Sequence, residues 1–516
     1  MGQSLAEYAS CPDCSAIVEL TPGGRQFRTH PRYGARCPGT GKRPAAAPSR
    51  ARRGSRLKIV ASAFAAVVAV LAGITAILAY VGVSPSKTPG VIPEPSHVRP
   101  EPSQVKIASS PQQLVSSAAN GKLGNGDSGR PSFDSSGRYV AFTSDATDLS
   151  QLASNGQYNI YRKDRDSGDV YLASPGVGGT PANGSSQFPI ICANGRFIAF
   201  ASTATNLVSA SAQLTGTYYQ VYVNDALTGQ TTLVSASTDG VPGDGDSRAP
   251  RFSSDCSKIV FESAADNLVP GVPSRSNNIY VRDLLNNTTV LASVGSGGAL
   301  LNNVSTHADI NHDGTLVAFT SWASNLPGSV PGHPEVYVQN LQTRQTIPVS
   351  SLYQSFCPDA QGFSWPDFSP DGKYLTFTSV DAPNDTDFRG KCVLVWDIAK
   401  QASAITTATG KPAGWDDACV TGVNNGTNFS PVMSDATSAH SYLVLFTVTR
   451  NGICNLVLRD LDGNEVPIKS QINLHQIVEP TLNSSGDFLS WDVAAQPEQH
   501  QQVYACRVDQ CAAGIS

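Results

Sequence analysis

The fold of this chain is decided by a four-residue stretch, YVAF (139–142), whose pattern returns six more times. Each copy is a short apolar strand that ends on an aromatic residue, and the later copies read FIAF (197–200), KIVF (258–261), LVAF (316–319), YLTF (374–377), LVLF (443–446) and FLSW (488–491). The final aromatics are 58, 61, 58, 58, 69 and 45 residues apart. A period of this length indicates tandem copies of one supersecondary unit.

Each unit contains four predicted strands. A strand and a tight turn such as FSPDGK (368–373) come before each copy, and the glycine supplies the positive φ that a tight hairpin needs. A third strand follows, as in NIYRKD (159–164), QVYVND (220–225), NIYVRD (278–283), EVYVQN (335–340) and NLVLRD (455–460), and then a fourth such as TTLVSA. Four antiparallel strands per unit with no helix between units predict an all-β, seven-bladed β-propeller, with eight blades as the alternative.

The ring of blades must also close. The segment 112–133 aligns without gaps with 231–252, so residues 112–118 correspond to a fourth strand that precedes the first complete set. We expect this strand to pair with the last blade, and the final four residues, AGIS, are the competitor for that edge.

The repeats resemble a known family. The residues that carry the likeness are FSPDGK (368–373), the [IV]-Y-V-x-[DN] strands, and the motif F-x-S-x-A-[TDS]-[DN]-L at 142–149, 200–207 and 261–268, with 319–326 close to it. They resemble TolB-like, PD40-type propellers of bacteria, which are built from WD40-like repeats, over roughly residues 107–516. The resemblance implies a binding or scaffolding propeller and specifies no reaction.

A second feature concerns the membrane. Residues 59–83 contain no charged side chain, and at about 1.5 Å per residue they are long enough to cross a bilayer as a helix. A buried core helix and a cleaved signal peptide are the alternatives. Seven basic residues lie in 42–58, whereas only Lys87 and Arg99 follow closely. The positive-inside rule therefore predicts a single-pass plasma-membrane protein with a cytoplasmic N-terminus, a basic linker at 42–58, a Pro-rich stalk at 84–106 and an extracytoplasmic propeller at 107–516.

Charge is divided in the same way along the 516 residues. Residues 1–58 carry 11 Lys and Arg against 3 Asp and Glu, and the remainder carries 25 against 38. The net charge of −5 thus combines +8 before the span with −13 from residue 59 onward. An acidic balance argues against nucleic-acid binding by the propeller.

The N-terminal segment 1–41 contains a candidate zinc site. Cys11, Cys14, His30 and Cys37 have the spacing C-x2-C-x15-H-x6-C, which suits a tetrahedral Cys3His site. A segment this short buries too little apolar surface to be stable alone, and a bound metal would provide the missing stability. The stretch also resembles zinc-ribbon-like heads of actinobacterial and phage proteins. Reduced thiols in a disordered tail are the alternative.

The eight cysteines beyond the predicted span should form disulfides in an oxidising compartment. The repeat register places Cys357 and Cys419 in inter-blade linkers, and each has a partner candidate at the entrance to a third strand. We expect four bridges: Cys357–Cys392, Cys419–Cys454, Cys192–Cys256 and Cys506–Cys511. Unpaired buried thiols are the alternative.

Catalytic motifs are scarce. The sequence GDSG at 126–129 returns as GDSR at 245–248, which favours a repeated turn over a serine-hydrolase motif. The carboxylates of Asp127, Asp244 and Asp246 suit Ca²⁺, with solvated turns as the alternative.

Four residues that we expect just before the first strands are predicted to line the mouth of the central channel: Arg130, Arg248, His307 and Trp365. Trp365 is the strongest candidate for a partner contact, because aromatic and Arg side chains dominate interface energetics. Loop anchoring is the alternative role. The sequence thus predicts a membrane-anchored, non-enzymatic module that binds a protein, a peptide or an envelope glycan. A propeller-based hydrolase or lyase and a sensor that signals through the zinc head are the competing hypotheses.

Overall fold

The chain divides into two compact units, residues 1–99 and 100–516. The computed structural model describes residues 8–10, 17–19, 112–152, 156–209, 214, 218–272, 276–380, 392–405, 413–415, 431–437, 441–450, 453–466, 468, 477–493 and 500–508. In the first unit, β1 (Tyr8–Ser10) and β2 (Ile17–Glu19) pair antiparallel, with Tyr8 opposite Glu19. The predicted zinc ligands Cys11, Cys14, His30 and Cys37 lie outside the described residues, as do the predicted span 59–83 and the stalk 84–106.

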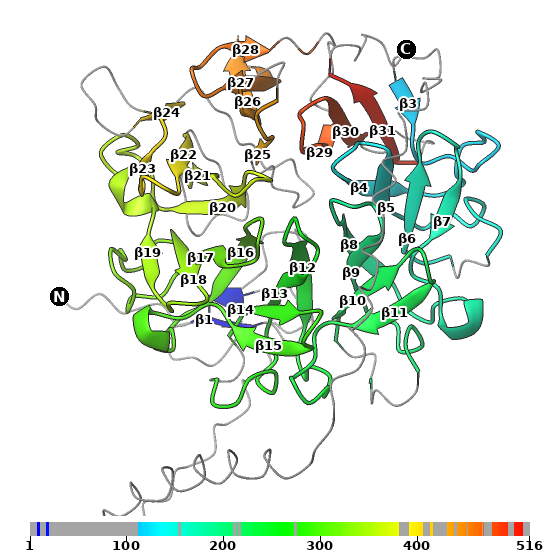
Figure 1. Ribbon diagram of the computed structural model, residues 1–516, viewed down its shortest axis with the longest axis horizontal. Helices are drawn as coiled ribbons and strands as arrows, with labels where there is room; N and C mark the ends of the chain where they lie inside the picture. The colour runs from blue at the N-terminus through cyan, green and yellow to red at the C-terminus, as the bar shows by residue number, and fades with distance from the viewer. Residues whose placement is uncertain are drawn as a thin grey trace, which may run out of the picture. The chain divides into compact units, whose positions relative to one another are not determined.

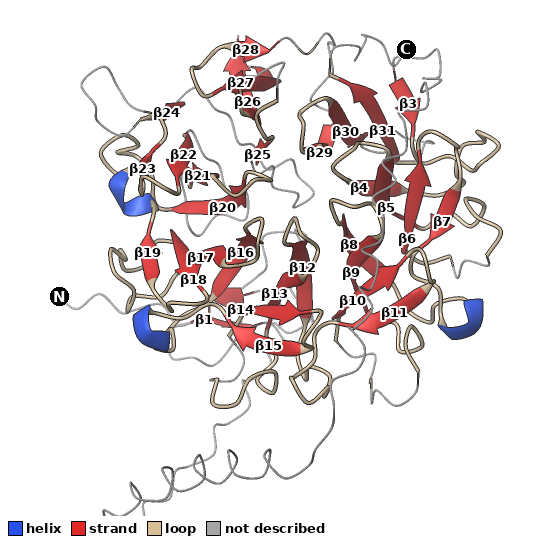
Figure 2. Ribbon diagram, in the orientation of Figure 1, coloured by secondary structure: helices blue, strands red, loops and turns tan. Residues whose placement is uncertain are grey.

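The second unit is a seven-bladed β-propeller, as predicted (Figure 1). The described residues of this unit form seven antiparallel sheets, and helix is limited there to three short 3-10 turns at Val177–Gly179, Ser296–Gly298 and Ser350–Leu352 (Figure 2). No helix in the described part of the chain is long and apolar enough to cross a membrane.

Blades 1 to 4 each contain four strands in chain order. They are β4 (Ser128–Phe133), β5 (Tyr139–Ser144), β6 (Asn159–Asp164) and β7 (Val170–Leu172); β8 (Ser186–Ile191), β9 (Phe197–Ser202), β10 (Gln220–Asp225) and β11 (Gln230–Leu233); β12 (Ser247–Phe252), β13 (Lys258–Ser263), β14 (Asn278–Asp283) and β15 (Thr288–Leu291); and β16 (Ser305–Ile310), β17 (Leu316–Ser321), β18 (Glu335–Asn340) and β19 (Thr346–Pro348).

Blades 5 to 7 are less regular. They contain β20 (Phe363–Phe368), β21 (Tyr374–Ser379), β22 (Val393–Asp397) and β23 (Ala402–Ser403), with β24 (Gly414–Trp415) also paired to β22; β25 (Val432–Met433), β26 (Leu443–Arg450), β27 (Ile453–Asp460) and β28 (Glu465–Val466); and β29 (Ile477–Leu482), β30 (Phe488–Val493) and β31 (Gln502–Arg507).

The ring closes through the N-terminal strand of the propeller, as the repeat alignment predicted. Strand β3 (Gln112–Leu114) pairs with β31, and Leu114 lies opposite Tyr504. The Ser116 hydroxyl accepts the Val503 N–H at 3.0 Å, the bond that Ser235 makes to Val221 within blade 2. β3 therefore takes the place of a fourth strand in blade 7. The competing residues 513–516 lie outside the described residues.

The blades pack through the repeated aromatics. Phe142, Phe200, Phe261, Phe319 and Phe377 are fully buried, and so is Trp491. In blade 2 the ring of Phe200 stacks on Tyr222, whose hydroxyl donates to the Ala204 carbonyl at 3.1 Å. The Ala carbonyl belongs to the A-[TDS]-[DN]-L part of the sequence motif, so that motif provides an acceptor for the buried tyrosine.

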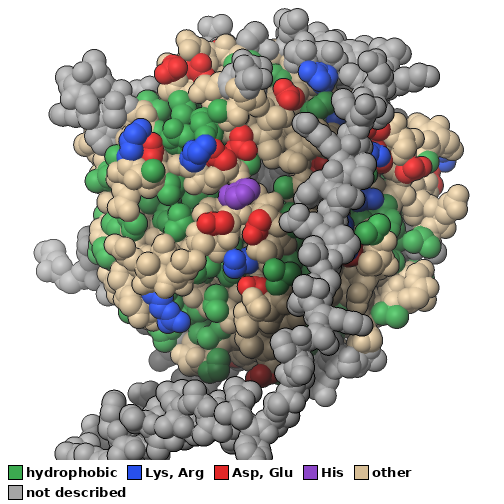
Figure 3. Space-filling model, in the orientation of Figure 1, with side chains coloured by type: hydrophobic (Ala, Val, Ile, Leu, Met, Phe, Trp, Pro, Cys, Tyr) green, Lys and Arg blue, Asp and Glu red, His purple; other side chains and the backbone are tan. Residues whose placement is uncertain are grey.

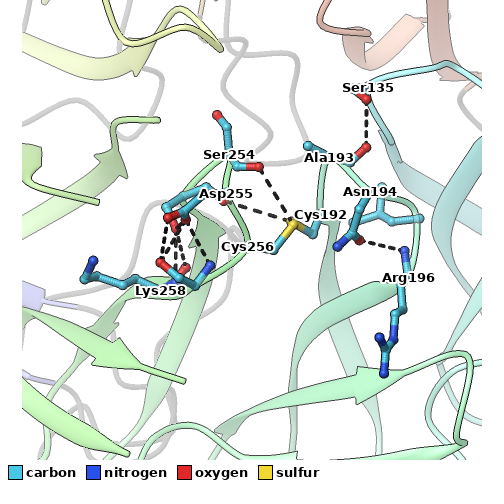
Figure 4. Close-up of a disulfide and its surroundings, with 12 residues drawn as sticks. Ser135, Cys192, Ala193, Asn194, Arg196, Ser254, Asp255, Cys256 and Lys258 are labelled. Carbon is cyan, nitrogen blue, oxygen red and sulfur yellow. Dashed lines mark hydrogen bonds between the residues drawn. A yellow bond between two sulfur atoms is a disulfide. The ribbon is translucent and has the colours of Figure 1, made fainter. Parts of the chain in front are cut away.

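The turns between first and second strands bond to one another around the ring. Cys192 and Cys256, in the turns of blades 2 and 3, form the predicted disulfide, and the Ser135 hydroxyl of blade 1 donates to Ala193 O at 2.8 Å (Figure 4). The other contacts run from Asp255 N to His312 O, from His312 Nδ1 to Pro370 O, from Asp371 N to Asp435 Oδ1, from Asp435 N to Ser484 O and from Asn483 Nδ2 to Ser135 O. Each turn thus holds both neighbours. Figure 3 shows one face of the propeller, where acidic and basic side chains gather around a histidine near the middle.

Candidate functional site

The first strand of each blade faces the central axis, and these strands contact one another around the ring (Figure 1). A β-bulge in which two residues lie opposite one occurs in β4, β8, β12, β16, β20 and β29, for example between Thr306 and Asp309 of β16, and the first five of these strands share a further backbone feature. The third residue of each has a positive φ: Arg130, Phe188, Ala249, His307 and Trp365, at 48° to 57°. Because five blades share this left-handed backbone conformation, we attribute it to the propeller fold and not to a particular site. The blades differ in the side chain that they carry at this position.

The four predicted channel residues lie on these innermost strands. They lie within the strands, whereas the sequence placed them just before the strands begin. Arg130, His307 and Trp365 occupy bulge positions, and Arg248 lies one residue before the bulge in β12. The Trp365 ring packs against His307 at 4.9 Å between centroids and is only 7% exposed. Trp365 therefore offers little surface to a partner.

The two arginines lie against aromatic rings. The Arg130 guanidinium lies 4.4 Å from the centroid of Phe188 in the next blade. That of Arg248 lies 4.3 Å from the Tyr219 ring and 3.3 Å from Asp246 Oδ2. Cation–π contacts hold both guanidinium groups in place at the axis.

Glu262 is the first carboxyl group that the sequence argument missed. It is half-buried in β13, and its Oε1 accepts the backbone N–H of His307 from the next blade at 2.6 Å. Burial raises the pKa of Glu262 to about 7, against the opposing effects of that hydrogen bond and of Arg251 and Arg248. The carboxyl is therefore divided between its neutral and ionised forms near neutral pH.

His307 lies beside it. Its Nδ1 is 3.0 Å from the hydroxyl of Ser364 and 3.2 Å from that of Thr306. Burial and the nearby Arg251 lower the pKa of His307 to about 4, so the ring is neutral at physiological pH.

Asp309 and Asp367 occupy the same position in β16 and β20. Asp309 Oδ2 accepts the Phe368 N–H at 2.7 Å, and Asp367 Oδ2 accepts the Met433 N–H at 3.3 Å, each from the next blade. Ser132 makes the equivalent bond to Ile191 in blade 2, at 3.2 Å. Burial raises the pKa of both carboxyl groups, and repulsion from Asp309 raises that of Asp367 further. The two aspartates thus hold blades together and share one electrostatic site.

Arg251 connects these groups. It lies in β12, and its charge acts on Glu262, His307, Asp309 and Asp367. Its side chain is exposed although β12 is an innermost strand, so water reaches the axis here. Among the described residues no carboxylate lies within ion-pair distance of its guanidinium, and its one hydrogen bond goes to the neighbouring Pro250 carbonyl at 3.3 Å.

The sequence contained one signal for these missed residues. Glu262 stands where blades 1, 2, 4 and 5 have Thr143, Ala201, Thr320 and Thr378, although blade 7 has Asp492 there, and Asp309 stands where the first two blades have Ser132 and Ile190. Comparison of the repeats at these two positions is therefore the signal that singles out the missed carboxylates.

The predicted calcium ligands take part in turn contacts. Asp127 Oδ1 accepts the Gln501 N–H at 2.8 Å, Asp244 Oδ1 accepts that of Asp266 at 3.0 Å, and Asp246 Oδ1 accepts that of Tyr219 at 2.8 Å. In the part of the chain that the structure describes, no group of three or more His, Cys, Asp or Glu side chains is arranged to hold a metal ion. Calcium binding at these aspartates remains a prediction.

Two of the four predicted disulfides are present in full, Cys192–Cys256 and Cys357–Cys392. Cys506 is disulfide-bonded, and its predicted partner Cys511 lies outside the described residues. Cys419 and the side chain of Cys454 also lie outside them.

No known family model matches this chain, and no curated protein matches it. Solved structures with a similar arrangement of strands include TolB from Acinetobacter baumannii, at 15% identity over 54% of this chain and 53% of that chain, with a TM-score of 0.33. An oligogalacturonate lyase in complex with manganese has 12% identity over 75% and 91%, with a TM-score of 0.45. The β-propeller domain of the trilobed protease from Pyrococcus furiosus has 12% identity over 74% and 95%, with a TM-score of 0.43. The match spans about half of the TolB chain.

Proposed function

We propose that the propeller is a binding module whose ligand contacts the central axis at Arg251. The observation that carries the proposal is the Arg251 guanidinium, which is exposed on an innermost strand and has no ion-pair partner among the described residues.

The ligand is a protein segment, a peptide or an envelope glycan. An arginine that has no ion-pair partner among the described residues and lies at a solvent-reached site is suited to charge-assisted hydrogen bonds with an incoming group. Arg248, fixed against Tyr219 on the same strand, extends the contact. The surrounding hydroxyl and carboxyl groups supply the convergent polar contacts that give a site its specificity.

The test is a comparison of ligand arrays. Full-length protein is applied to arrays of peptides and of bacterial envelope glycans, beside Arg251→Gln and the control Arg344→Gln. Arg344 is an exposed arginine in the β18–β19 hairpin, away from the axis. A ligand that binds the wild type and the control but not Arg251→Gln supports the proposal. Arrays on which no ligand depends on Arg251 refute it.

A second candidate function is acid–base catalysis on a glycan or peptide. It is favoured by the raised pKa of Glu262, about 7, because a general acid or base works best with a pKa near the working pH. Hydrolysis or elimination of an array-identified ligand, lost in Glu262→Gln with binding retained, would establish an enzyme. Retention of the activity in that variant would exclude this residue as the catalyst.

We also propose that residues 59–83 anchor the protein in the plasma membrane, with a zinc-binding head inside and the propeller outside. The uncharged span, its basic flank and the disulfides Cys192–Cys256 and Cys357–Cys392 support this arrangement. Protease treatment of intact cells should digest the propeller and spare an epitope tag at the N-terminus. Zinc content of the full-length protein should fall in Cys11→Ser.

A further inference from the structure

The seam between blades 7 and 1 is built differently from the seams between the other blades. Blade 7 takes its fourth strand from the start of the propeller, so β3 is held to β31 by hydrogen bonds and not by a hairpin. Residues 115–118 continue this contact, and the Val115 N–H donates to Val503 O at 2.8 Å. We call residues 112–118 the strap. The chain that precedes the propeller enters it through the strap, so a pull on that chain acts here.

Arg165, which follows the third strand of blade 1, bonds the strap to that blade. Its Nε donates to Gln113 Oε1 at 2.9 Å, and its backbone carbonyl accepts Gln113 Nε2 at 3.0 Å. Its Nη1 donates to Gly137 O in the first turn of blade 1 at 2.6 Å. The guanidinium also lies 4.6 Å from the ring centroid of Phe488 in blade 7. One side chain thus contacts the strap, blade 1 and blade 7.

Lys163, on β6 of blade 1, holds the other end of the strap. Its side chain is buried, and its Nζ donates to Ser117 O at 2.9 Å, to Ala118 O at 3.3 Å and to Gly168 O at 2.8 Å. Among the described residues neither Lys163 nor Arg165 forms an ion pair, so neutral groups satisfy both charges. Hydrogen bonds from a charged donor are stronger than those between neutral groups. The two cations therefore bind the strap more firmly than a neutral side chain could.

Comparison of the repeats shows which of these contacts is particular to the seam. The residues at the position of Arg165 in blades 2, 3 and 4 are Ala226, Leu284 and Leu341. Lys163 is matched in blade 3 by Arg282, whose Nη1 donates to Ser237 O at 3.1 Å. The loop that Arg282 holds continues from a strand that a hairpin joins to blade 2, whereas the loop that Lys163 holds continues from the strap. Arg165 is thus an addition at a seam that no hairpin secures.

We propose that the strap opens on its own, without unfolding of the blades, and that Arg165 and Lys163 hold it shut. This inference goes beyond the proposed function, because it concerns the outer edge of the ring and not the axis. The ladder between β3 and β31 covers only three residues, and a segment held by few bonds opens at a lower free energy than a whole domain unfolds. Opening leaves the outer edge of β31 unpaired, and unpaired edges pair readily with other chains. The two cations keep this state rare because they bond the strap to blade 1.

The experiment is hydrogen exchange of the full-length protein in detergent, measured by mass spectrometry of peptic fragments. Arg165→Met and Lys163→Met are compared with the wild type and with Arg282→Met, which removes the equivalent cation where a hairpin already joins the strands. We expect the strap and β31 to exchange about tenfold faster in the first two variants, because each loses hydrogen bonds from a charged donor. Fragments of blades 2 to 5 should keep their wild-type rates. Arg282→Met should leave the exchange of the strap and β31 unchanged.

Gln113→Ala keeps the test decisive if a Met variant does not fold, because it removes only the partner of Arg165 on the strap. It should speed exchange of the strap about threefold, and adding it to Arg165→Met should give no further increase. Equal acceleration in all seven blades would show that the cations support the whole fold, and would refute a strap that opens on its own. Wild-type exchange of the strap in Gln113→Ala and in both Met variants would also refute it, because the cations would then not hold the strap.

Discussion

Blades 1 to 4 and blades 5 to 7 build the same kind of sheet with different contacts. In each of the first four blades a third-strand tyrosine packs on the second-strand phenylalanine, in the pairs Phe142–Tyr161, Phe200–Tyr222, Phe261–Tyr280 and Phe319–Tyr337, at 5.8 to 5.9 Å. In blade 5 the third strand has Leu394 opposite Phe377 and provides no ring.

Blade 5 obtains its aromatic contact from elsewhere. Tyr353, which follows a 3-10 turn in the linker before the blade, packs edge-on against Phe377 at 5.3 Å and donates its hydroxyl to Val395 O at 2.7 Å. The Cys357–Cys392 disulfide ties the same linker to the entrance of β22. Blade 7 returns to the regular pattern, with Trp491 stacked on Tyr504 at 6.2 Å. The comparison shows that a blade needs a filled core position more than a particular source for the ring.

The axial chemistry follows a different division. Glu262 belongs to a regular blade and Asp367 to an irregular one, so carboxylates near the axis occur in both kinds of blade. A charged side chain at the axis therefore does not require the sheet around it to change. In this propeller the core packing of a blade and the charged residues near the axis vary independently of each other. Such independence allows one fold to have different functional sites.

The largest expected effect tests whether the substituted core of blade 5 is equivalent to a regular one. Phe319→Ala in blade 4 and Phe377→Ala in blade 5 each remove a ring that is fully buried. Each should cost about 3–5 kcal/mol of unfolding free energy, the usual cost of truncating a buried phenylalanine. Urea denaturation of the two variants measures both values. A cost below about 1 kcal/mol for Phe377→Ala alone would show that Tyr353 does not replace the third-strand tyrosine.

The regular features could be predicted from the sequence because they repeat. Seven aromatic strand ends and their glycine turns gave the blade number, the gapless match of 112–133 gave the closure by β3, and the register gave Cys192–Cys256 and Cys357–Cys392.

The axial residues could not be predicted in the same way, because the bulge breaks the alternation of a strand. With two residues opposite one, side chains beyond the bulge no longer point where a period of two places them. Asp309 and Asp367 lie just beyond bulges, so the period of two does not mark them as axial, and only a comparison between repeats singles them out. The same bulge turns Trp365 against His307, which is why a residue expected to be exposed is 7% exposed.

The second effect concerns the disulfide between the linker before blade 5 and the entrance to β22. It closes a loop with a sequence separation of 35 residues, so its removal should cost about 3–4 kcal/mol through the unfolded chain. The double variant Cys357→Ser with Cys392→Ser tests this by urea denaturation. The matched variant Cys192→Ser with Cys256→Ser removes the turn-to-turn bridge, whose separation of 64 residues predicts a similar cost. If the variant without Cys357–Cys392 has an unchanged unfolding free energy, the packing of blade 5 alone accounts for its stability.

The third effect is the change in unfolding free energy caused by the charged side chain of Glu262 in a regular blade. The folded-state pKa of Glu262, about 7, is above its unfolded value of 4.5, so the ionised side chain opposes folding. The penalty is absent below about pH 4.5, where both states are protonated, and it is complete above about pH 7. Glu262→Gln should therefore add about 2 kcal/mol to stability at pH 8 and almost nothing at pH 4.5. Denaturation at both pH values measures this. Equal gains at the two pH values would mean that charge is not the cause.

The smallest expected effect is a difference between blades 3 and 4, whose sequences are alike but whose buried tyrosines differ in hydrogen bonding. The Tyr280 hydroxyl of blade 3 donates to Ala265 O at 3.1 Å, whereas the buried Tyr337 hydroxyl of blade 4 has no hydrogen-bond partner among the described residues. Tyr280→Phe removes a buried hydrogen bond and leaves the carbonyl without its donor, so it should cost about 1 kcal/mol. Tyr337→Phe removes only an unsatisfied hydroxyl and should be neutral or slightly stabilising.

Because the two substitutions delete the same atom beneath the same kind of ring stack, each is the other's control, and the difference in urea midpoint isolates the hydrogen bond. Equal costs would show that Tyr337 has found a partner, and blade 4 would then be as regular in its bonds as in its sequence.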